Sequence, residues 1–440
     1  MNPIANIPQS SRQRVVILGG GFAGLKLSRK LSKSNYQVVL LDRNNYHQFQ
    51  PLFYQVATAG LEPSAITFPL RKIFQHQKNI HFRVAEVQKV DPAQKKIVTD
   101  IGYVDYDILV LAIGADTNYF KNKNIERHAA PMKSLNEALS LRNKILSNYE
   151  NALNTNESDK AAALMNIVIV GGGPTGVELA GAIAEMKKFI LPKDYPELDF
   201  SKMKVQLLEA APRILGGYSK KSSEKAFAYL EKLGVEVRLN TLVEDFDGRE
   251  VQLKGGEALN ARTLIWAAGI KANTVEGLPE SVYGHNQRLI VDRFNSVKGL
   301  EDVYALGDMA YMETEAYPKG HPQVAQVALQ QATLLYKNLR AVQKNKEAKP
   351  FAYTDKGSLA TVGRNLAIAD LAFVHLGGFV AWALWLFVHL MALVGVKNRL
   401  FVFINWAWSY FTYDQSLRLL IHPKSWKGEL PEEEVEMATA

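Results

Sequence analysis

The feature of this sequence that most limits its fold is a pair of glycine-rich turns, each placed between an apolar run and a helical pattern. They lie in "RVVILGGGFAGLKL" and "NIVIVGGGPTGVELAG", and their glycines have the same spacing: Gly19, Gly21 and Gly24 in the first, Gly171, Gly173 and Gly176 in the second. In each case the apolar run predicts a buried strand, and the turn opens a helix. Two such units within 440 residues predict an α/β protein with two Rossmann-like domains.

Each glycine of such a turn has a physical reason. The first makes the tight turn, the second lets the backbone approach a pyrophosphate, and the third lets helix and strand pack closely. The N–H groups and the dipole at the helix start attract phosphate charge. We therefore predict two dinucleotide sites, with Phe22 and Ala23 joining the glycines of the first.

An acidic residue closes the strand after each turn, where it can accept hydrogen bonds from a ribose. Asp42 follows Gly24 by 18 residues and Glu209 follows Gly176 by 33, against an expected spacing of about 20. The alternative for either acid is a solvated residue at a strand end. A carboxylate at Glu209 repels a 2′-phosphate and so favours NADH over NADPH, although Arg213 lies close enough in sequence to meet a phosphate.

Composition excludes several kinds of chemistry. The chain contains no cysteine, which removes disulfides, iron–sulfur ligation and thiol catalysis, and we predict no metal site. Lys and Arg exceed Asp and Glu by 52 to 44, a surplus compatible with an anionic membrane surface. Because no dense basic run occurs, we predict no nucleic-acid partner. The opening "MNPIANIPQSSRQR" lacks the apolar core of a signal peptide, so we expect a protein that stays on the cytoplasmic side.

The C-terminal part differs in composition from the rest of the chain. Leu371 to Val396 contains no Asp, Glu, Lys or Arg, and an aromatic, uncharged run follows from Leu400 to Tyr413. Leu376 to Val396 is long enough to span a bilayer, and its tryptophans suit the membrane interface. We favour an anchor lying on one leaflet, with a single span and a buried dimer interface as alternatives.

Three features of the sequence resemble the two-dinucleotide-binding flavoprotein reductases. They are the paired turns, the strand-end glycines Gly114 and Gly269, and "VYALGD" at Val303 to Asp308. That resemblance implies FAD on the N-terminal unit and a nicotinamide nucleotide on an inserted second unit. It also implies that Asp308 contacts the ribityl–phosphate chain, where the plain alternative is a turn-forming Asp. The absence of cysteine closes the branches that reduce disulfides or oxidise sulfide.

Several longer blocks resemble the type II NADH dehydrogenases. They are "NNYHQFQPLFYQVATAGLEPSAI", "GGGPTGVELAG", "EAAPRILGGYS", "AQVALQQ" and "YTDKGSLATVGR". The resemblance implies non-covalent FAD, NADH as substrate, and a membrane quinone (menaquinone or ubiquinone) as acceptor, without proton pumping. It also implies a homodimer docked on the cytoplasmic face of the cell inner membrane. We expect an FAD domain at 12–130 and 286–350, an NADH domain at 131–285 and a membrane-anchoring region at 351–440.

Four residues are candidates for the chemistry. We expect a helix to open at His321-Pro322 and to present Gln326 and Gln330, four apart, on one face. The resemblance places them beside the flavin at the quinone pocket, with Gln326 also a cofactor contact; the alternative is a surface helix with two exposed glutamines. Lys356 can stabilise a developing quinolate, or it is an ordinary loop lysine.

Glu178 follows Gly176 by two residues, so its carboxylate suits the helix dipole. By resemblance it also faces the nicotinamide–flavin contact, where it positions the nicotinamide or relays a proton. Two rival functions remain open at this point: a soluble NAD(P)H reductase of a ferredoxin-like protein, and a flavoprotein that binds NADH as a sensor.

Overall fold

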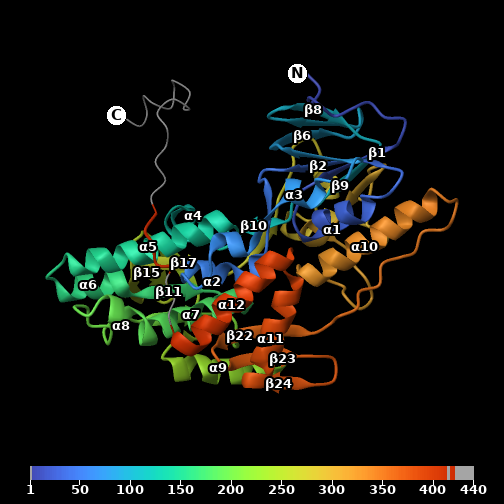
Figure 1. Cartoon of the computed structure of the whole chain (residues 1–440). Coiled ribbons are helices and arrows are strands. Elements are labelled where there is room, and N and C mark those ends of the chain that lie inside the picture. Colours follow the sequence, from blue (N-terminus) through green and yellow to red (C-terminus); the bar gives the residue numbers. More distant parts are fainter. Residues whose placement is uncertain (1, 414–416, 422–440) are drawn as a thin grey trace, which may run out of the picture.

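The computed structural model describes residues 2–413 and 417–421. It contains two α/β domains and a C-terminal segment of three strands and two helices (Figure 1). The remaining part of the predicted anchoring region 351–440, residues 414–416 and 422–440, lies outside the described residues.

The first domain is built on a five-stranded sheet in the order β20-β9-β1-β2-β5, in which every pair is parallel. Its strands are β1 (Arg14–Leu18), β2 (Gln37–Asp42), β5 (Ile80–Val84), β9 (Ile108–Leu111) and β20 (Val303–Ala305). Side chains alternate between the two faces of β1: Val15 and Ile17 join one core cluster, Val16 and Leu18 another. A sheet buried on both faces explains why β1 reads as a continuous apolar run.

Each face of this sheet has its own cover. Helices α1 (Phe22–Leu31) and α10 (Ala325–Val342) pack together on one side. An antiparallel sheet of β6 (Val87–Asp91), β7 (Lys96–Thr99) and β8 (Gly102–Asp105) contributes to the core on the other.

The second domain repeats the pattern with a parallel sheet in the order β13-β12-β11-β17. These strands are β11 (Ile167–Val170), β12 (Val205–Leu208), β13 (Glu236–Arg238) and β17 (Thr263–Trp266). An antiparallel meander of β14 (Val243–Phe246), β15 (Glu250–Leu253) and β16 (Ala258–Asn260) joins it. Helix α7 (Pro174–Phe189) begins directly after the second glycine turn.

The chain passes between the two domains through a two-stranded antiparallel ribbon. Strand β10 (Ala115–Thr117) leads out of the first domain, and β18 (Ile270–Ala272) pairs with it on the way back. The second domain is therefore inserted into the first, as the resemblance to the flavoprotein reductases implied. The domain ranges given above stay proposals.

The remaining helices and strands connect or cover these sheets. They are β3 (Tyr46–Gln48), α2 (Phe53–Ala57), β4 (Thr67–Pro69), α3 (Leu70–Phe74), α4 (Lys123–His128), α5 (Leu135–Leu153), α6 (Ser158–Met165), α8 (Leu191–Asp194), α9 (Lys220–Leu233), β19 (Leu289–Ile290) and β21 (Ala310–Tyr311). Short 3-10 turns include η2 (Pro63–Ala65) and η5 (Gly307–Met309). The Ser134 cap of α5 closes a capping box with Glu137.

The C-terminal segment forms an antiparallel sheet, β22 (Ser358–Gly363), β23 (Leu366–Asp370) and β24 (His375–Gly377), followed by α11 (Phe379–Ala392) and α12 (Val396–Thr412). The run Leu376 to Val396, which is long enough for the alternative of a single span, does not form one helix. Strand β24 opens the run, α11 ends at Ala392, and Gly395, at φ +88°, is the N-cap of α12. A Cβ on Gly395 would lie 2.4 Å from the Phe68 ring, so the chain is pinned against the first domain there. Within the described residues, no helix is both long and apolar enough to cross a membrane.

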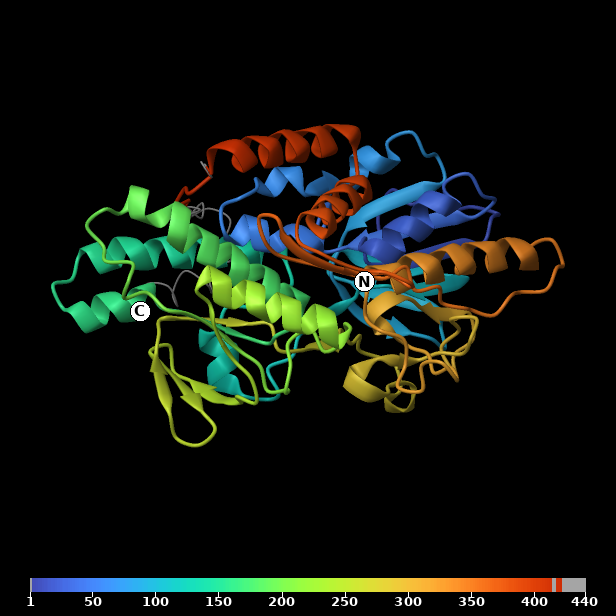
Figure 2. The same cartoon turned by 90° about the horizontal axis from the view of Figure 1, so that it is seen from below.

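The two C-terminal helices bridge the domains. Trp406 of α12 donates its indole N–H to Gln55 of α2 at 2.8 Å, and Tyr413 after α12 packs on Phe189 of α7 with ring centroids 4.6 Å apart. Figure 2 shows α12, in red, lying across the junction between the blue and green domains. The largest core cluster accordingly draws residues from both domains and from the C-terminal segment.

Candidate functional site

The first glycine turn leaves no room for side chains at two positions and open space at the third. Gly19 has φ +97°, and a Cβ there would lie 2.4 Å from the carbonyl oxygen of Ala112 on the next strand. A Cβ on Gly24 would lie 1.8 Å from the carbonyl oxygen of Gly19, whereas one on Gly21 would meet nothing within 4 Å. Gly21, at the N-cap of α1, therefore borders open space where a pyrophosphate can approach.

The second turn has the same construction. Gly171 has φ +108°, and a Cβ there would lie 2.5 Å from the carbonyl oxygen of Ala267. A Cβ on Gly176 would lie 1.9 Å from the Gly171 oxygen. Gly173 is the N-cap of α7 and has open space beside it. The two turns therefore offer equivalent phosphate sites.

The strand-end acids also act alike in both domains. Asp42 Oδ2 accepts the N–H of Gly20 at 2.5 Å, and Glu209 Oε2 accepts the N–H of Gly172 at 2.6 Å. Each carboxylate thus fixes the middle of its turn, at the strand end where an acid can accept hydrogen bonds from a ribose. Burial raises the pKa of Asp42, and the backbone N–H groups of Gly20 and Asn44 oppose that rise.

Arg213 is tied to its own loop. Its guanidinium donates to the carbonyl oxygens of Tyr218 at 3.1 Å and Gly216 at 2.7 Å. The side chain thereby shapes the loop after Glu209, and a 2′-phosphate would compete with these bonds.

The carboxyl edge of the first sheet brings the other predicted FAD contacts together. Gly114 has φ +71° and open space beside it. Asp308 lies in η5, which α10 contacts and fixes through a bond from the Gly307 N–H to Gln331 Oε1 at 2.7 Å. Burial raises the pKa of Asp308, while Lys133 and Arg288 lower it. The open cradles at Gly21 and Gly114 and the half-buried carboxyl at η5 fit an elongated, phosphate-bearing cofactor such as FAD.

Gly269 is placed differently from Gly114. The ring of Phe120 lies over it, 3.0 Å from where a Cβ would stand, and Phe120 itself is largely exposed. A nucleotide reaching Gly269 would therefore meet Phe120 first.

Glu178 is an ionisable group in a buried position. It is 8% exposed, and its Oε1 accepts the indole N–H of Trp385 at 3.3 Å and, at a longer 3.5 Å, the N–H of Thr361. Burial raises the pKa of Glu178 to about 8, although both bonds lower it. At neutral pH this carboxyl is therefore largely protonated and can donate a hydrogen bond.

An aromatic group surrounds this carboxyl on the C-terminal side. Trp385 is fully buried, stacks on His389 with centroids 4.0 Å apart, and meets Tyr54 edge to face. His389 in turn packs edge to face on Phe49, which packs on Phe22 at the first glycine turn. The expectation that the tryptophans of this run lie at a membrane interface is wrong for Trp385, which is buried against Glu178. The four-residue spacing of Trp385 and His389 on one helix face was the available signal.

Gln326 and Gln330 share a helix face, as expected, but α10 begins at Ala325, so the predicted start at His321-Pro322 is wrong. Val324 is the N-cap, and the N–H of Val324 bonds the Pro322 oxygen in a turn before the helix. Each amide pairs with backbone. Gln330 bonds both the N–H and the oxygen of Thr354, and Gln326 bonds the Lys356 N–H and the Gly357 oxygen.

These four bonds hold the segment that carries Lys356 along one face of α10. The two glutamines thereby fix where the C-terminal segment starts, and their amide groups are engaged in doing so. The side chain of Lys356 lies near the N-terminal domain, since it contributes to lowering the pKa of Lys26 after burial and two nearer cations.

The outer faces of α11 and α12 are apolar and exposed. The exposed side chains are Phe379, Val380, Phe387, Val388 and Met391 on α11, and Val396, Leu400, Phe401, Phe403, Ile404, Trp408 and Phe411 on α12. We call these twelve residues the apolar face. Lys397 lies over the Phe401 ring and Lys72 over the Phe68 ring, so basic groups border it.

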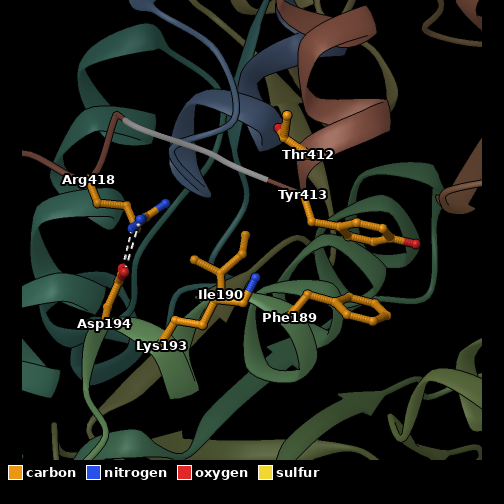
Figure 3. A pocket seen from close by; sticks show the side chains of 7 residues that line it. All are labelled: Phe189, Ile190, Lys193, Asp194, Thr412, Tyr413 and Arg418. Carbon is orange, nitrogen blue, oxygen red and sulfur yellow. Dashed lines mark hydrogen bonds and ion pairs between the residues drawn. The ribbon is translucent and has the colours of Figure 1, made fainter.

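A pocket of about 220 Å³ lies at the far end of α12 (Figure 3). Asp194 and Arg418 form an ion pair across it, and Phe189 lies beside Tyr413. Phe189 follows Glu178 on α7 by 11 residues, roughly 16 Å along the helix. The pocket therefore joins the end of α12 to α7 and α8, away from the carboxyl.

The comparisons with known proteins agree with this geometry. A family model described as pyridine nucleotide-disulphide oxidoreductase matches residues 13–332, and one described as the NDH2 C-terminal domain matches residues 356–412. The chain therefore belongs to the pyridine nucleotide-disulphide oxidoreductases.

Curated relatives narrow the class. Type II NADH:quinone oxidoreductase Ndh of Mycobacterium tuberculosis is 35% identical over 430 residues, covering 93% of this chain and 90% of that protein. The type II NADH:quinone oxidoreductase of Staphylococcus aureus is 28% identical, covering 80% and 88%. Within its class the chain belongs to the type II NADH:quinone oxidoreductases, which makes it an FAD-dependent NADH dehydrogenase.

Solved structures share the fold. NDH2 from Plasmodium falciparum in complex with NADH matches with a TM-score of 0.86 at 22% identity, covering 93% of this chain and 100% of that one. The sulfide:quinone oxidoreductase of Aquifex aeolicus matches with a TM-score of 0.70 at 18% identity, covering 93% and 96%.

Proposed function

We propose that this protein oxidises NADH and reduces a membrane quinone at a site between the two glycine turns, closed on one side by α11. NADH and quinone as substrates and FAD as cofactor follow from the family. The position of Glu178 supports this location. Its buried carboxyl lies on α7, the helix after the second glycine turn, and contacts Trp385 of the C-terminal segment. The match of 356–412 to the NDH2 C-terminal domain favours this function over a ferredoxin reductase or a sensor.

Bound FAD supplies the redox chemistry, accepting a hydride from NADH and passing two electrons to the quinone. The chain's own part is to bind and orient. Gly21 and Gly173 open their helix N-termini to the pyrophosphates, while Asp42 and Glu209 receive the riboses. The net reaction, NADH + H⁺ + Q → NAD⁺ + QH₂, takes up one proton from solution.

Glu178 is the group we assign to the junction of nicotinamide and flavin. Its protonated carboxyl donates a hydrogen bond there, and its pKa of about 8 suits a group that gives and regains a proton near neutral pH. Gln326 and Gln330 act by holding the segment of Lys356, whose ammonium group stabilises negative charge developing on the quinone oxygen.

The apolar face lies on a lipid bilayer in this proposal. Each large apolar side chain that enters lipid contributes roughly 1.5–3 kcal/mol, and bordering lysines add attraction to anionic headgroups. Because NADH is a cytoplasmic metabolite, we place this docking on the cytoplasmic face of the inner membrane, and we propose that the enzyme is a homodimer. The acceptor is menaquinone or ubiquinone.

Spectroscopy of the purified holoenzyme tests the function. We expect flavin absorbance to disappear on addition of NADH and to return with a short-chain quinone. A Glu178→Gln variant should return its absorbance at least about a hundredfold more slowly, the lower end of what general acid catalysis contributes. Bleaching that quinone does not reverse would contradict the function, and an unchanged rate in the variant would remove Glu178 from it.

Liposome sedimentation tests the docking. Phe387→Glu with Phe401→Glu should lower the bound fraction at least about tenfold, since the two exposed rings leave the lipid. Val342→Glu on α10 is the matched control, because Val342 is exposed to the same extent as Phe387, 62%, but lies outside the apolar face. Equal loss in both proteins would argue against the assigned surface.

A further inference from the structure

Helix α11 is one of the two helices that carry the apolar face, and it also reaches Glu178 in the interior. Trp385 donates its indole N–H to Glu178 Oε1 at 3.3 Å, although the two residues are 207 positions apart in the sequence. Trp385 is 1% exposed. One helix therefore has an outer side suited to lipid and an inner side that touches the acid at the proposed site.

The indole has little freedom to turn away. His389, one helical turn later, stacks on it at 4.0 Å with ring planes 23° apart, and Trp406 of α12 packs beside it at 5.8 Å. The Nδ1–H of His389 donates to the Trp385 carbonyl at 2.8 Å, since a carbonyl can only accept. Burial lowers the pKa of His389 to about 4, so its ring stays neutral against the indole.

We propose that Trp385 is a positioning residue of this enzyme: its indole N–H holds the carboxyl of Glu178 in its working orientation, so that the C-terminal docking segment completes the active site. The inference rests on the role proposed for Glu178 above. It gives the C-terminal segment a part in the chemistry besides membrane attachment.

The physical effect of this contact has a definite sign. A donor N–H stabilises the ionised carboxylate, so the bond lowers the pKa of Glu178, while burial raises it. Other titratable groups near the carboxyl are Tyr54 from α2, Tyr218 from the loop before α9, His389 on α11, and Glu185 two turns along α7. Removing the indole N–H while keeping the ring should therefore raise the pKa of Glu178.

The experiment replaces Trp385 by benzothienylalanine, which keeps the bicyclic shape and lacks the N–H. Trp406 receives the same replacement as the matched control, because its N–H bonds Gln55 rather than the acid. The measurement is an infrared titration of the oxidised holoenzyme between about pH 5 and 10. The carboxyl C=O band of Glu178 is identified as the band that the Glu178→Gln variant lacks. Trp385→Phe repeats the measurement with a natural residue.

In the Trp385 protein we expect the pH midpoint of the titration of this band to rise by about half to one pH unit, and the band frequency to change because the hydrogen bond is lost. Both quantities should stay unchanged in the Trp406 protein. The rate at which quinone restores flavin absorbance should then fall with pH along the shifted curve.

An unchanged midpoint in the Trp385 protein, an equal shift in the Trp406 protein, or the lack of any titrating Glu178 band would overturn the inference. Failure of the proposed role of Glu178 looks different: Glu178→Gln would restore absorbance at the normal rate, whereas the infrared shift at Trp385 would still be seen.

Discussion

Replacing Glu178 by glutamine should make the protein more stable at high pH and leave its stability at low pH nearly unchanged. Burial raises the pKa of Glu178 from 4.5 to about 8, so the folded state keeps a proton that the unfolded chain has already lost. The free energy of unfolding therefore falls as the pH rises through this range and stays lowered above it. A glutamine has no proton to lose and escapes this penalty.

The magnitude follows from the two pKa values. Each pH unit between them is worth about 1.4 kcal/mol, which gives an upper limit of about 5 kcal/mol for a side chain that is 8% exposed. At an unfolding entropy of about 2.1 cal/mol/K per residue, a chain of 440 residues gains about 1 °C in Tm for each kcal/mol. We expect the variant's Tm to exceed that of the natural protein by about 3–5 °C at pH 9 and by less than about 1 °C at pH 5.

Thermal unfolding of the oxidised holoenzyme, followed by circular dichroism from pH 5 to pH 9, measures this difference. Glu224→Gln is the control, since Glu224 is exposed on α9 and pairs with Lys220 across one helical turn. This variant removes the same charge, and its Tm difference from the natural protein should not grow with pH. A Tm difference between Glu178→Gln and the natural protein that does not change with pH would refute the reasoning.

Three further predictions test other parts of the site. Gln330→Ala should speed amide hydrogen exchange at Thr354 about two- to tenfold, because a hydrogen bond worth about 0.5–1.5 kcal/mol is lost; Gln343→Ala, at the end of α10, should not. Gly181→Ala should lower Tm by several degrees, since its Cβ would lie 1.6 Å from the Val362 oxygen, whereas Gly217→Ala, with nothing within 4 Å, should leave it unchanged. Glu209→Gln should narrow the preference for NADH over NADPH in kcat/KM by about tenfold, as repulsion of a 2′-phosphate is removed, and an unaltered ratio would assign that selectivity elsewhere.

The local geometry of the nucleotide sites could be read from the sequence. Gly19 and Gly171 adopt positive φ and crowd the neighbouring strand, and these are requirements of a few adjacent residues. The acids that close the next strands, Asp42 and Glu209, could be placed for the same reason, because a parallel βαβ unit brings them back beside its own turn. The absence of cysteine likewise narrows the chemistry from the sequence alone, because a chain without thiols cannot reduce its acceptor through one.

The partners of the candidate chemical residues could not be read in this way. Helical spacing put Gln326 and Gln330 on one face, but only the folded chain brings the backbone of 354–357 against them. The roles of these residues and of Lys356 remain predictions. Hydropathy made Leu376 to Val396 long enough for a single span. In the folded chain α11 ends at Ala392, and Gly395, the N-cap of α12, lies close against Phe68, more than three hundred residues earlier.

The sequence by itself determined that two helix N-termini would each carry a phosphate-binding turn, since strand, turn and helix are set by residues within one short stretch. Only the tertiary structure decided that Glu178 would be buried and bonded by Trp385. The proton affinity of a carboxyl depends on what surrounds it in space, and those surroundings come from both domains and from the end of the chain.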